Sequence, residues 1–83
     1  MVKKRKRTFQ EIRLRLLKGL ISGQRPINEL ARVSGVNWKT TELHMTYLSG
    51  RGLVHEAFNS PYVRIFEITE LGKELTEKGG RIR

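Results

Sequence analysis

The side chains that most often perform chemistry in proteins are sparse in this sequence. It has two histidines, His44 and His55, and no cysteine or aspartate to join them as metal ligands. No nucleophile stands in a pattern with a base and an orienting acid, which covalent catalysis requires. The segment Gly50-Arg51-Gly52 is shorter than a phosphate-binding loop and lacks its Lys-Ser/Thr ending. The sequence therefore predicts no enzyme, no metal, no cofactor and no small-molecule substrate.

Charge is the strongest compositional signal. The 83 residues include 17 Lys and Arg against 8 acidic residues, for a formal net charge of +9. Such an excess favours polyanionic partners, with nucleic acid first and an anionic membrane surface second. No apolar run approaches the roughly 20 residues that cross a bilayer, and the absence of cysteine fits a reducing compartment. A cytoplasmic protein at the nucleoid, without a membrane partner, is expected.

A dense basic run opens the chain, and residues 1–7 are expected to be a flexible tail. Five cations in succession repel one another and rarely order alone. The tail can act as an arm along nucleic-acid phosphates, which the overall charge favours, or it can serve only solubility. Residues 79–83 are expected to be a second, shorter basic tail. The arm candidates are Lys3, Lys4, Arg5, Lys6 and Arg7.

The elements that must position any binding residues begin with a helix over residues 9–21, which Gly23 is expected to end. Thr8 and Glu11 have the spacing of a capping box. One side of this helix has apolar residues at core spacing, namely Phe9, Ile12, Leu16 and Leu20. A second apolar side is covered loosely by the tail or forms a dimer interface, and both alternatives stay open. Its members are Leu14, Leu17 and Ile21.

A short helix, a glycine turn and a longer helix follow an extended link at residues 25–27. The short helix is expected over residues 28–33 with Asn28 as its N-cap. Gly35 permits a sharp reversal, and Val36 is expected to fill the corner.

The longer helix is expected over residues 37–49, with Asn37 as its cap. Three residues recur at core spacing: Thr41, Met45 and Leu48. Several others are expected to point away from that face: Lys39, Thr40, Leu43, Thr46 and Tyr47. His44 lies at its edge, and Trp38 is assigned to the core edge because of its size.

A β-hairpin and a last helix complete the domain, which is expected to span residues 8–78. Residues 53–58 and 62–68 read as two strands joined by a turn at residues 59–61. In the second strand, Tyr62, Phe66 and Ile68 are expected to face the core. Thr69 is expected to cap a helix that ends near Lys78, with two residues pointing inward, Leu71 and Leu75.

The turn and the wing carry a family resemblance. Asn28-Glu29-Leu30-Ala31 followed by Ser34-Gly35-Val36-Asn37-Trp38-Lys39-Thr40 resembles the turn region of archaeal winged-helix transcriptional regulators. Three further segments resemble that family's helix end, its first wing strand and the exit from its second wing strand, in that order: Leu48, Gly52-Leu53-Val54 and Phe66-Glu67-Ile68-Thr69-Glu70-Leu71-Gly72. The resemblance covers residues 12–75. It implies an α+β, single winged helix-turn-helix domain, with three helices, a hairpin wing and a short C-terminal helix.

Candidate DNA-binding residues follow from placing the helix over residues 37–49 in the major groove of double-stranded DNA. The helix candidates are Asn37, Trp38, Lys39, Thr40, Leu43, His44 and Tyr47. The wing and backbone candidates are Arg25, Arg32, Arg51, Asn59, Ser60 and Arg64. Arg64 is two residues from both Tyr62 and Phe66, so its side chain is expected on the same, inward face of the strand. Packing near the tip is therefore the alternative to a DNA contact for this arginine.

Three functions fit this arrangement. The first is a sequence-specific transcriptional regulator, acting as a homodimer on a palindrome. The second is an architectural chromatin protein that relies on phosphates and tails. The third is a protein-interaction module with an apolar patch at Leu14, Leu17, Ile21, Leu43 and Tyr47. Tyr62 and Phe66 offer only part of the aromatic platform that RNA-binding sheets use.

Overall fold

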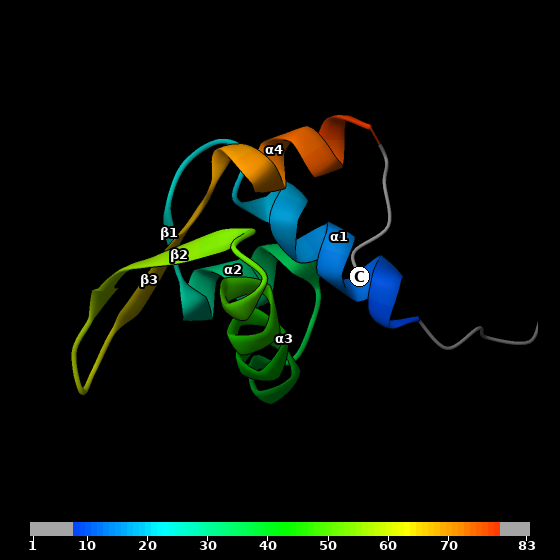
Figure 1. Ribbon diagram of the computed structural model, residues 1–83. Coiled ribbons are helices and arrows are strands. Elements are labelled where there is room, and N and C mark those ends of the chain that lie inside the picture. The colour runs from blue at the N-terminus through cyan, green and yellow to red at the C-terminus, as the bar shows by residue number, and fades with distance from the viewer. Residues whose placement is uncertain (1–7, 79–83) are drawn as a thin grey trace, which may run out of the picture.

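The computed structural model describes residues 8–78. These residues form four helices and a three-stranded antiparallel sheet (Figure 1). The elements in chain order are α1 (Phe9–Gly19), β1 (Arg25–Pro26), α2 (Ile27–Ser34), α3 (Trp38–Gly50), β2 (Val54–Asn59), β3 (Arg64–Ile68) and α4 (Glu70–Glu77). The order expected from the sequence is confirmed, with β1 added.

The start of α1 was predicted correctly from the sequence, and its end was not. The capping box is confirmed, because Thr8 Oγ1 accepts from the Glu11 amide at 3.1 Å and the Glu11 carboxylate accepts from the Thr8 amide at 2.9 Å. The helix ends earlier than expected. Its C-cap is Leu20 in the right-handed region, while Gly23 lies in the following loop with a φ of 148°.

The extended link is a strand. Arg25 pairs with Phe66 and Pro26 with Ile65, so β1 lies at one edge of the sheet, in the order β1-β3-β2. An edge is where a proline is tolerated, because its missing N–H is not needed by a further strand.

The helix-turn-helix is built as expected except at the first cap. α2 begins at Ile27 after Pro26, and no side chain caps it, so the prediction for Asn28 is wrong. Gly35 is the left-handed C-cap, with a φ of 68°, and Val36 is buried at the corner. Asn37 caps α3, since its Oδ1 accepts from the Thr40 amide at 2.8 Å.

The hairpin is shorter and less regular than predicted. Glu56 pairs with Phe66 and Phe58 with Ile65, which leaves Ala57 as an extra residue in β2. Such a bulge bends the strand. Since β3 begins only at residue 64, Tyr62 lies in the connecting turn and is 91% exposed. The prediction that Tyr62 joins the core is therefore wrong, whereas Phe66 is fully buried as expected.

The core lies between α1, α2, α3 and the sheet. Its fully buried side chains are Leu16, Leu17, Leu20, Leu30, Thr41, Met45, Leu48 and Phe66. Besides Tyr62, two further residues that were expected to face the core are exposed. Phe9 is exposed because it lies at the first turn of α1, beyond the core edge, and Leu71 is exposed because α4 turns Gly72 inward instead.

The second apolar side of α1 is covered in part by α4 of the same chain. α4 packs along α1, so Leu17 is fully buried and belongs to the core (Figure 1). Leu14 is half-buried, and Ile21 is exposed. The three residues therefore do not form one surface stripe, and Leu17 is unavailable to a partner.

Candidate nucleic-acid interface

α3 presents one side to solvent. Lys39 and Thr46 are exposed, and the Leu43 side chain is 68% exposed. Spacings of four and three residues put these side chains on one face. Their outward orientation is as predicted, while Thr40 is half-buried at its border. The face is thus open to a partner, with an uncharged centre and a cation at its first turn.

The first turn of α3 has a polarity suited to an anion. The backbone N–H groups there point out of the helix, and the aligned peptide dipoles favour negative charge. The turn contains no acidic residue, and Lys39 lies within it. Asn37 Oδ1 occupies only the Thr40 amide.

His44 and Tyr47 are held inside a cluster with residues of α1. Arg13 donates from Nε to His44 Nδ1 at 3.2 Å, and its guanidinium carbon lies 3.7 Å from the centre of the Tyr47 ring. Phe9 meets His44 edge to face at 5.2 Å. His44 is 6% exposed, and Tyr47 packs half-buried against the core. The Tyr47 ring is therefore covered, which corrects its expected outward placement, and His44, which was expected at the edge of the core-facing side, is buried.

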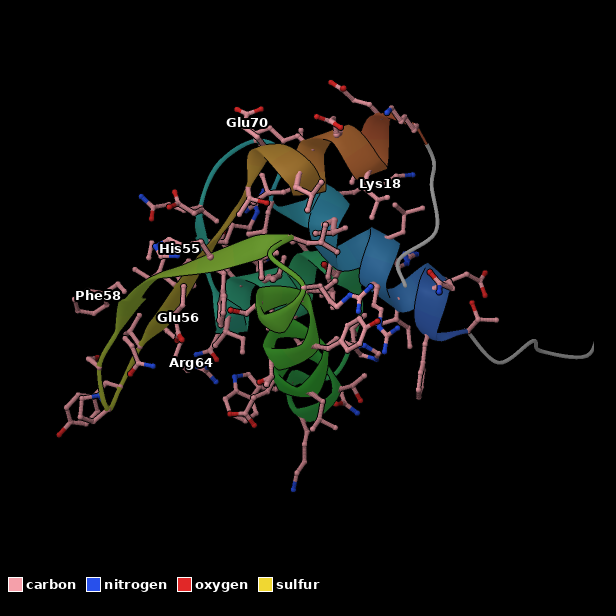
Figure 2. All side chains as sticks on the ribbon, in the orientation of Figure 1. Lys18, His55, Glu56, Phe58, Arg64 and Glu70 are labelled. Atoms are coloured by element: carbon pink, nitrogen blue, oxygen red, sulfur yellow. The ribbon has the colours of Figure 1, made fainter. Side chains whose placement is uncertain are left out.

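Arg64 is committed to carboxylates of the protein. It donates from Nε to Glu56 Oε2 at 2.6 Å and from Nη1 to Glu42 Oε2 at 3.4 Å, which joins the wing to α3. Asn59 Nδ2 donates to the same Glu56 oxygen at 2.9 Å. Figure 2 shows Glu56 and Arg64 on the side of the hairpin that faces α3. Arg64 thus packs within the protein through these ion pairs, and its guanidinium also lies 5.2 Å from the ring centre of the buried Phe66.

The same network shifts two pKa values. Hydrogen bonds from Arg64 lower the pKa of the Glu56 carboxyl, against a smaller opposing effect of burial. The hydrogen bond to Glu56 raises the pKa of Arg64. In α3, burial and then the charge of Arg13 lower the pKa of His44 below its ordinary value.

Two further candidates have structural partners. Arg25 donates to the Gly19 carbonyl at 2.6 Å and pairs with Glu29 at 2.5 Å, which fixes β1 to the end of α1 and the start of α2. Ser60 builds the wing turn, where its amide donates to the Val63 carbonyl at 2.8 Å. A phosphate contact by the Arg25 guanidinium would have to replace these bonds.

Positive charge is distributed unevenly along the chain. Ten of the 17 Lys and Arg and all eight glutamates lie in residues 8–78, so this part contributes +2 of the net +9. Arg32, Lys39 and Arg51 are exposed on α2 and around α3 and form no ion pair within residues 8–78. Three glutamates lie on α4, and Glu70 is at the end of the molecule opposite α3 (Figure 2). The five arm candidates at positions 3–7 lie outside the described residues.

A groove separates the N-terminal end of α3 from the wing tip. It has a volume of about 240 Å³, and its lining includes Trp38, Glu42, Pro61, Tyr62 and Arg64. The Trp38 side chain is 45% exposed there, so its assignment to the core edge is wrong. An aromatic side chain thus stands on each side of the groove.

The sequence prediction missed the apolar character of the wing tip. Phe58, Tyr62 and Val63 are exposed by 53%, 91% and 40%. An available signal was the lack of any charged residue between Glu56 and Arg64. The bulge and the late start of β3, which turn these side chains outward, leave no comparable mark in the sequence.

No protein-family model and no curated protein sequence match the chain, whereas solved structures do. Sso10a-2, a DNA-binding protein from Sulfolobus solfataricus, superposes with a TM-score of 0.75 at 24% identity, covering 87% of this chain and 74% of that one. BpsR of Bordetella bronchiseptica, whose DNA binding is regulated by 6-hydroxynicotinic acid, gives 0.74 at 16% identity, covering 81% and 49%. The chain thus spans about half the length of BpsR.

A third structure is the homodimeric winged helix-turn-helix domain of Mb0332 from Mycobacterium bovis, a possible ArsR-family regulator. It gives a TM-score of 0.70 at 25% identity, covering 82% of this chain and 63% of that one. Among residues 8–78, no helix is both long and apolar enough to cross a membrane, and no cluster of His or Glu could hold a metal ion. These structural neighbours come from bacteria and archaea, and the chain shares their winged helix-turn-helix fold.

Proposed function

We propose that this protein is a transcriptional regulator that binds double-stranded DNA by inserting α3 into the major groove. The observation that carries the proposal is the open face of α3, with Lys39, Leu43 and Thr46 exposed on a helix that a major groove accommodates. The fold shared with Sso10a-2 and BpsR, both described as binding DNA, supports it. A catalytic role is not part of the proposal.

The exposed residues take different roles in this placement. Lys39 donates to guanine O6 and N7 or to a phosphate, and Leu43 and Thr40 pack on thymine methyl groups. Asn37 and the amides of the first turn of α3 hold a phosphate. Arg32 and Arg51, one on each side of α3 in the sequence, reach the backbone, together with the basic arm at residues 3–7.

A homodimer is the proposed binding unit. Mb0332 is described as homodimeric, and the Ile21 side chain, with half-buried Leu14 on the same helix, leaves apolar surface exposed on α1. Two copies would place two α3 helices about 34 Å apart on a palindromic site. The fold shared with Sso10a-2 of Sulfolobus solfataricus supports an archaeal regulator. DNA binding would place the protein at the nucleoid in the cytoplasm.

Selection of bound duplexes from a random pool, at two salt concentrations, tests the proposal. A defined motif is expected at both. On that motif, the double variant Lys39→Ala/Thr40→Ala should lose affinity by about 5- to 150-fold, which is 1–3 kcal/mol, and should lose little on other DNA. Lys78→Ala is the matched control, because this lysine is exposed at the far end of α4. Failure of the chain to bind any duplex at low salt overturns the proposal and favours a protein-interaction module.

An architectural protein with little sequence preference is the second candidate. The charge division favours it, because residues 1–7 and 79–83 hold +7 of the net +9. Deleting residues 1–7 should then weaken binding to every sequence alike. The log–log salt dependence should become shallower by about 0.9 for each phosphate that the shortened chain no longer neutralises. A pool without an enriched motif, together with that uniform weakening, would replace the regulator with this second function.

A further inference from the structure

The wing tip lacks the cations that would grip DNA phosphates. From Ala57 to Val63 the chain has no charged side chain. The only arginine of the hairpin, Arg64, is held by Glu56 and Glu42. The tip instead exposes apolar surface on Phe58 and Tyr62, and Pro61 is exposed beside them. Its contact with a partner must therefore be made mainly by apolar packing.

The tip is rigid enough to keep that surface exposed. Ser60 Oγ accepts from the amides of Tyr62 and Val63 at 3.3 and 3.1 Å, and the Ser60 amide donates to the Val63 carbonyl. Pro61 fixes its own φ within the turn. The Tyr62 side chain consequently projects from a preorganised turn, and little conformational entropy remains to be lost by the backbone on binding.

The position of the tip relative to α3 is also fixed. Arg64 bridges Glu56 of β2 and Glu42 of α3, so the hairpin is tied to the helix beside the groove of about 240 Å³, which Glu42 and Arg64 help to line. Trp38 lines the groove from α3, and Tyr62 lines it from the wing. A rigid body with two projections on either side of a groove can straddle one DNA strand.

We propose that the wing tip is an apolar wedge that enters the minor groove next to the major groove occupied by α3, with Tyr62 at its leading edge. This inference rests on the proposed DNA binding. The strand between the two grooves lies in the groove of the protein, where Trp38 and Tyr62 pack on its deoxyribose rings. Apolar side chains that enter a minor groove unstack base steps and bend the duplex toward the major groove.

The wedge makes two measurable contributions that a cationic wing would not. It bends DNA, and it adds affinity that does not depend on salt, because no counterions are released at the tip. The salt dependence of DNA binding then comes from the phosphate contacts of Lys39, Arg32, Arg51 and the basic arm. A protein that docks on the same apolar tip would give neither DNA bending nor a change in DNA affinity when Tyr62 is replaced.

The experiment compares the full chain with Tyr62→Ser and Tyr62→Leu on the selected duplex, labelled at both ends for energy transfer. Tyr62→Ser should lose about tenfold in affinity and most of the bend, with an unchanged salt slope, and Tyr62→Leu should restore both in large part. The side chain is almost fully exposed, so both variants should fold. Leu71→Ser, an exposed apolar residue on α4, is the matched control.

Three outcomes overturn the wedge while DNA binding stands. The first is a Tyr62→Ser variant with the same affinity and DNA bend as the wild type. The second is a straight duplex in the wild-type complex. The third is a log–log salt slope that is shallower by about 0.9 in Tyr62→Ser, which corresponds to the loss of one phosphate contact. Absence of duplex binding by the wild-type chain is a different result, and it overturns the proposed function itself.

Discussion

Arg64 and Glu56 face each other across the wing hairpin, with Nε of the arginine 2.6 Å from Oε2 of the glutamate and Nη2 3.2 Å from Oε1. The two parallel hydrogen bonds form the bidentate geometry in which a guanidinium binds a carboxylate most strongly. Both side chains are about one quarter exposed. The pair therefore fixes Arg64 against β2, from where it also reaches Glu42 of α3, while its contribution to stability is limited by solvent.

Glu56→Gln is expected to lower the free energy of unfolding at pH 7 by about 0.5–1 kcal/mol, since a partly exposed pair contributes little more. The pKa of Glu56 is lowered in the folded state, so its stabilisation is present above the ordinary glutamate value of about 4.3 and is lost as the pH falls through the folded-state pKa. Urea unfolding at pH 7 and below pH 3 measures this. Glu74→Gln is the control, because its partner Lys78 is 3.9 Å away on the exposed side of α4. An equal loss at both pH values would contradict the assignment.

A second prediction concerns His44. Burial and Arg13 lower its pKa in the folded state, so the unfolded chain binds a proton first. Stability is then full above the ordinary histidine pKa of about 6.5 and declines as the pH falls from there toward the folded-state value. His44→Asn keeps an acceptor near the position of Nδ1 without a titrating group, and it should flatten the change in unfolding free energy between pH 7.5 and 5.5. His55→Asn, at an exposed position, should leave that change intact. A slope that persists in His44→Asn and disappears in His55→Asn would reverse the assignment.

Much of the fold could be predicted because local signals and the core pattern agreed. The capping box at Thr8, the Asn37 cap, the left-handed Gly35 and the buried stripe of α3 all depend on short spacings. The pairing of β1 could not be predicted, because two residues have no periodicity and Pro26 argues against a central strand.

The site was harder to predict because tertiary contacts decide which polar residues stay free. Helical spacing placed Lys39 and Leu43 outward. It could not show that Arg13 of α1 covers Tyr47 and His44, or that Arg64 is held by two carboxylates. In each case the residue that covers or binds the side chain is distant from it in the sequence, so local spacing does not reveal the contact.

The two asparagines that were expected to cap helices should behave differently. Asn37→Ala removes the acceptor for the Thr40 amide, and about 1 kcal/mol of stability should be lost. Asn28→Ala should change the unfolding free energy by less than about 0.5 kcal/mol, because α2 is not capped by a side chain. Thermal and urea unfolding of the two variants, compared at one pH, checks this. Equal losses would mean that Asn28 has a structural role of its own.

The last prediction concerns Gly72, the buried residue of α4. A Cβ atom there would meet the Leu53 carbonyl oxygen, and it would lie 2.7 Å from Ile68 Cγ1. α4 cannot retreat easily, because Thr69 accepts from the Gly72 amide at 3.1 Å and donates to the Gly52 carbonyl at 2.7 Å. Gly72→Ala should therefore cost about 1–3 kcal/mol of stability, as overpacking usually does.

Gly50→Ala is the matched control for this change. Gly50 is the last residue of α3, and a Cβ atom there would have no neighbour within 4 Å. This variant should be neutral, or more stable by up to about 1 kcal/mol, because alanine favours a helix over glycine. Gly72 lies against Leu53 and Ile68, and α4 also packs on α1. A displacement of α4 in Gly72→Ala should therefore speed amide exchange around Leu17, which hydrogen exchange can detect. If Gly72→Ala were as stable as the wild type, close packing at Gly72 could not be the reason that Leu71 faces solvent.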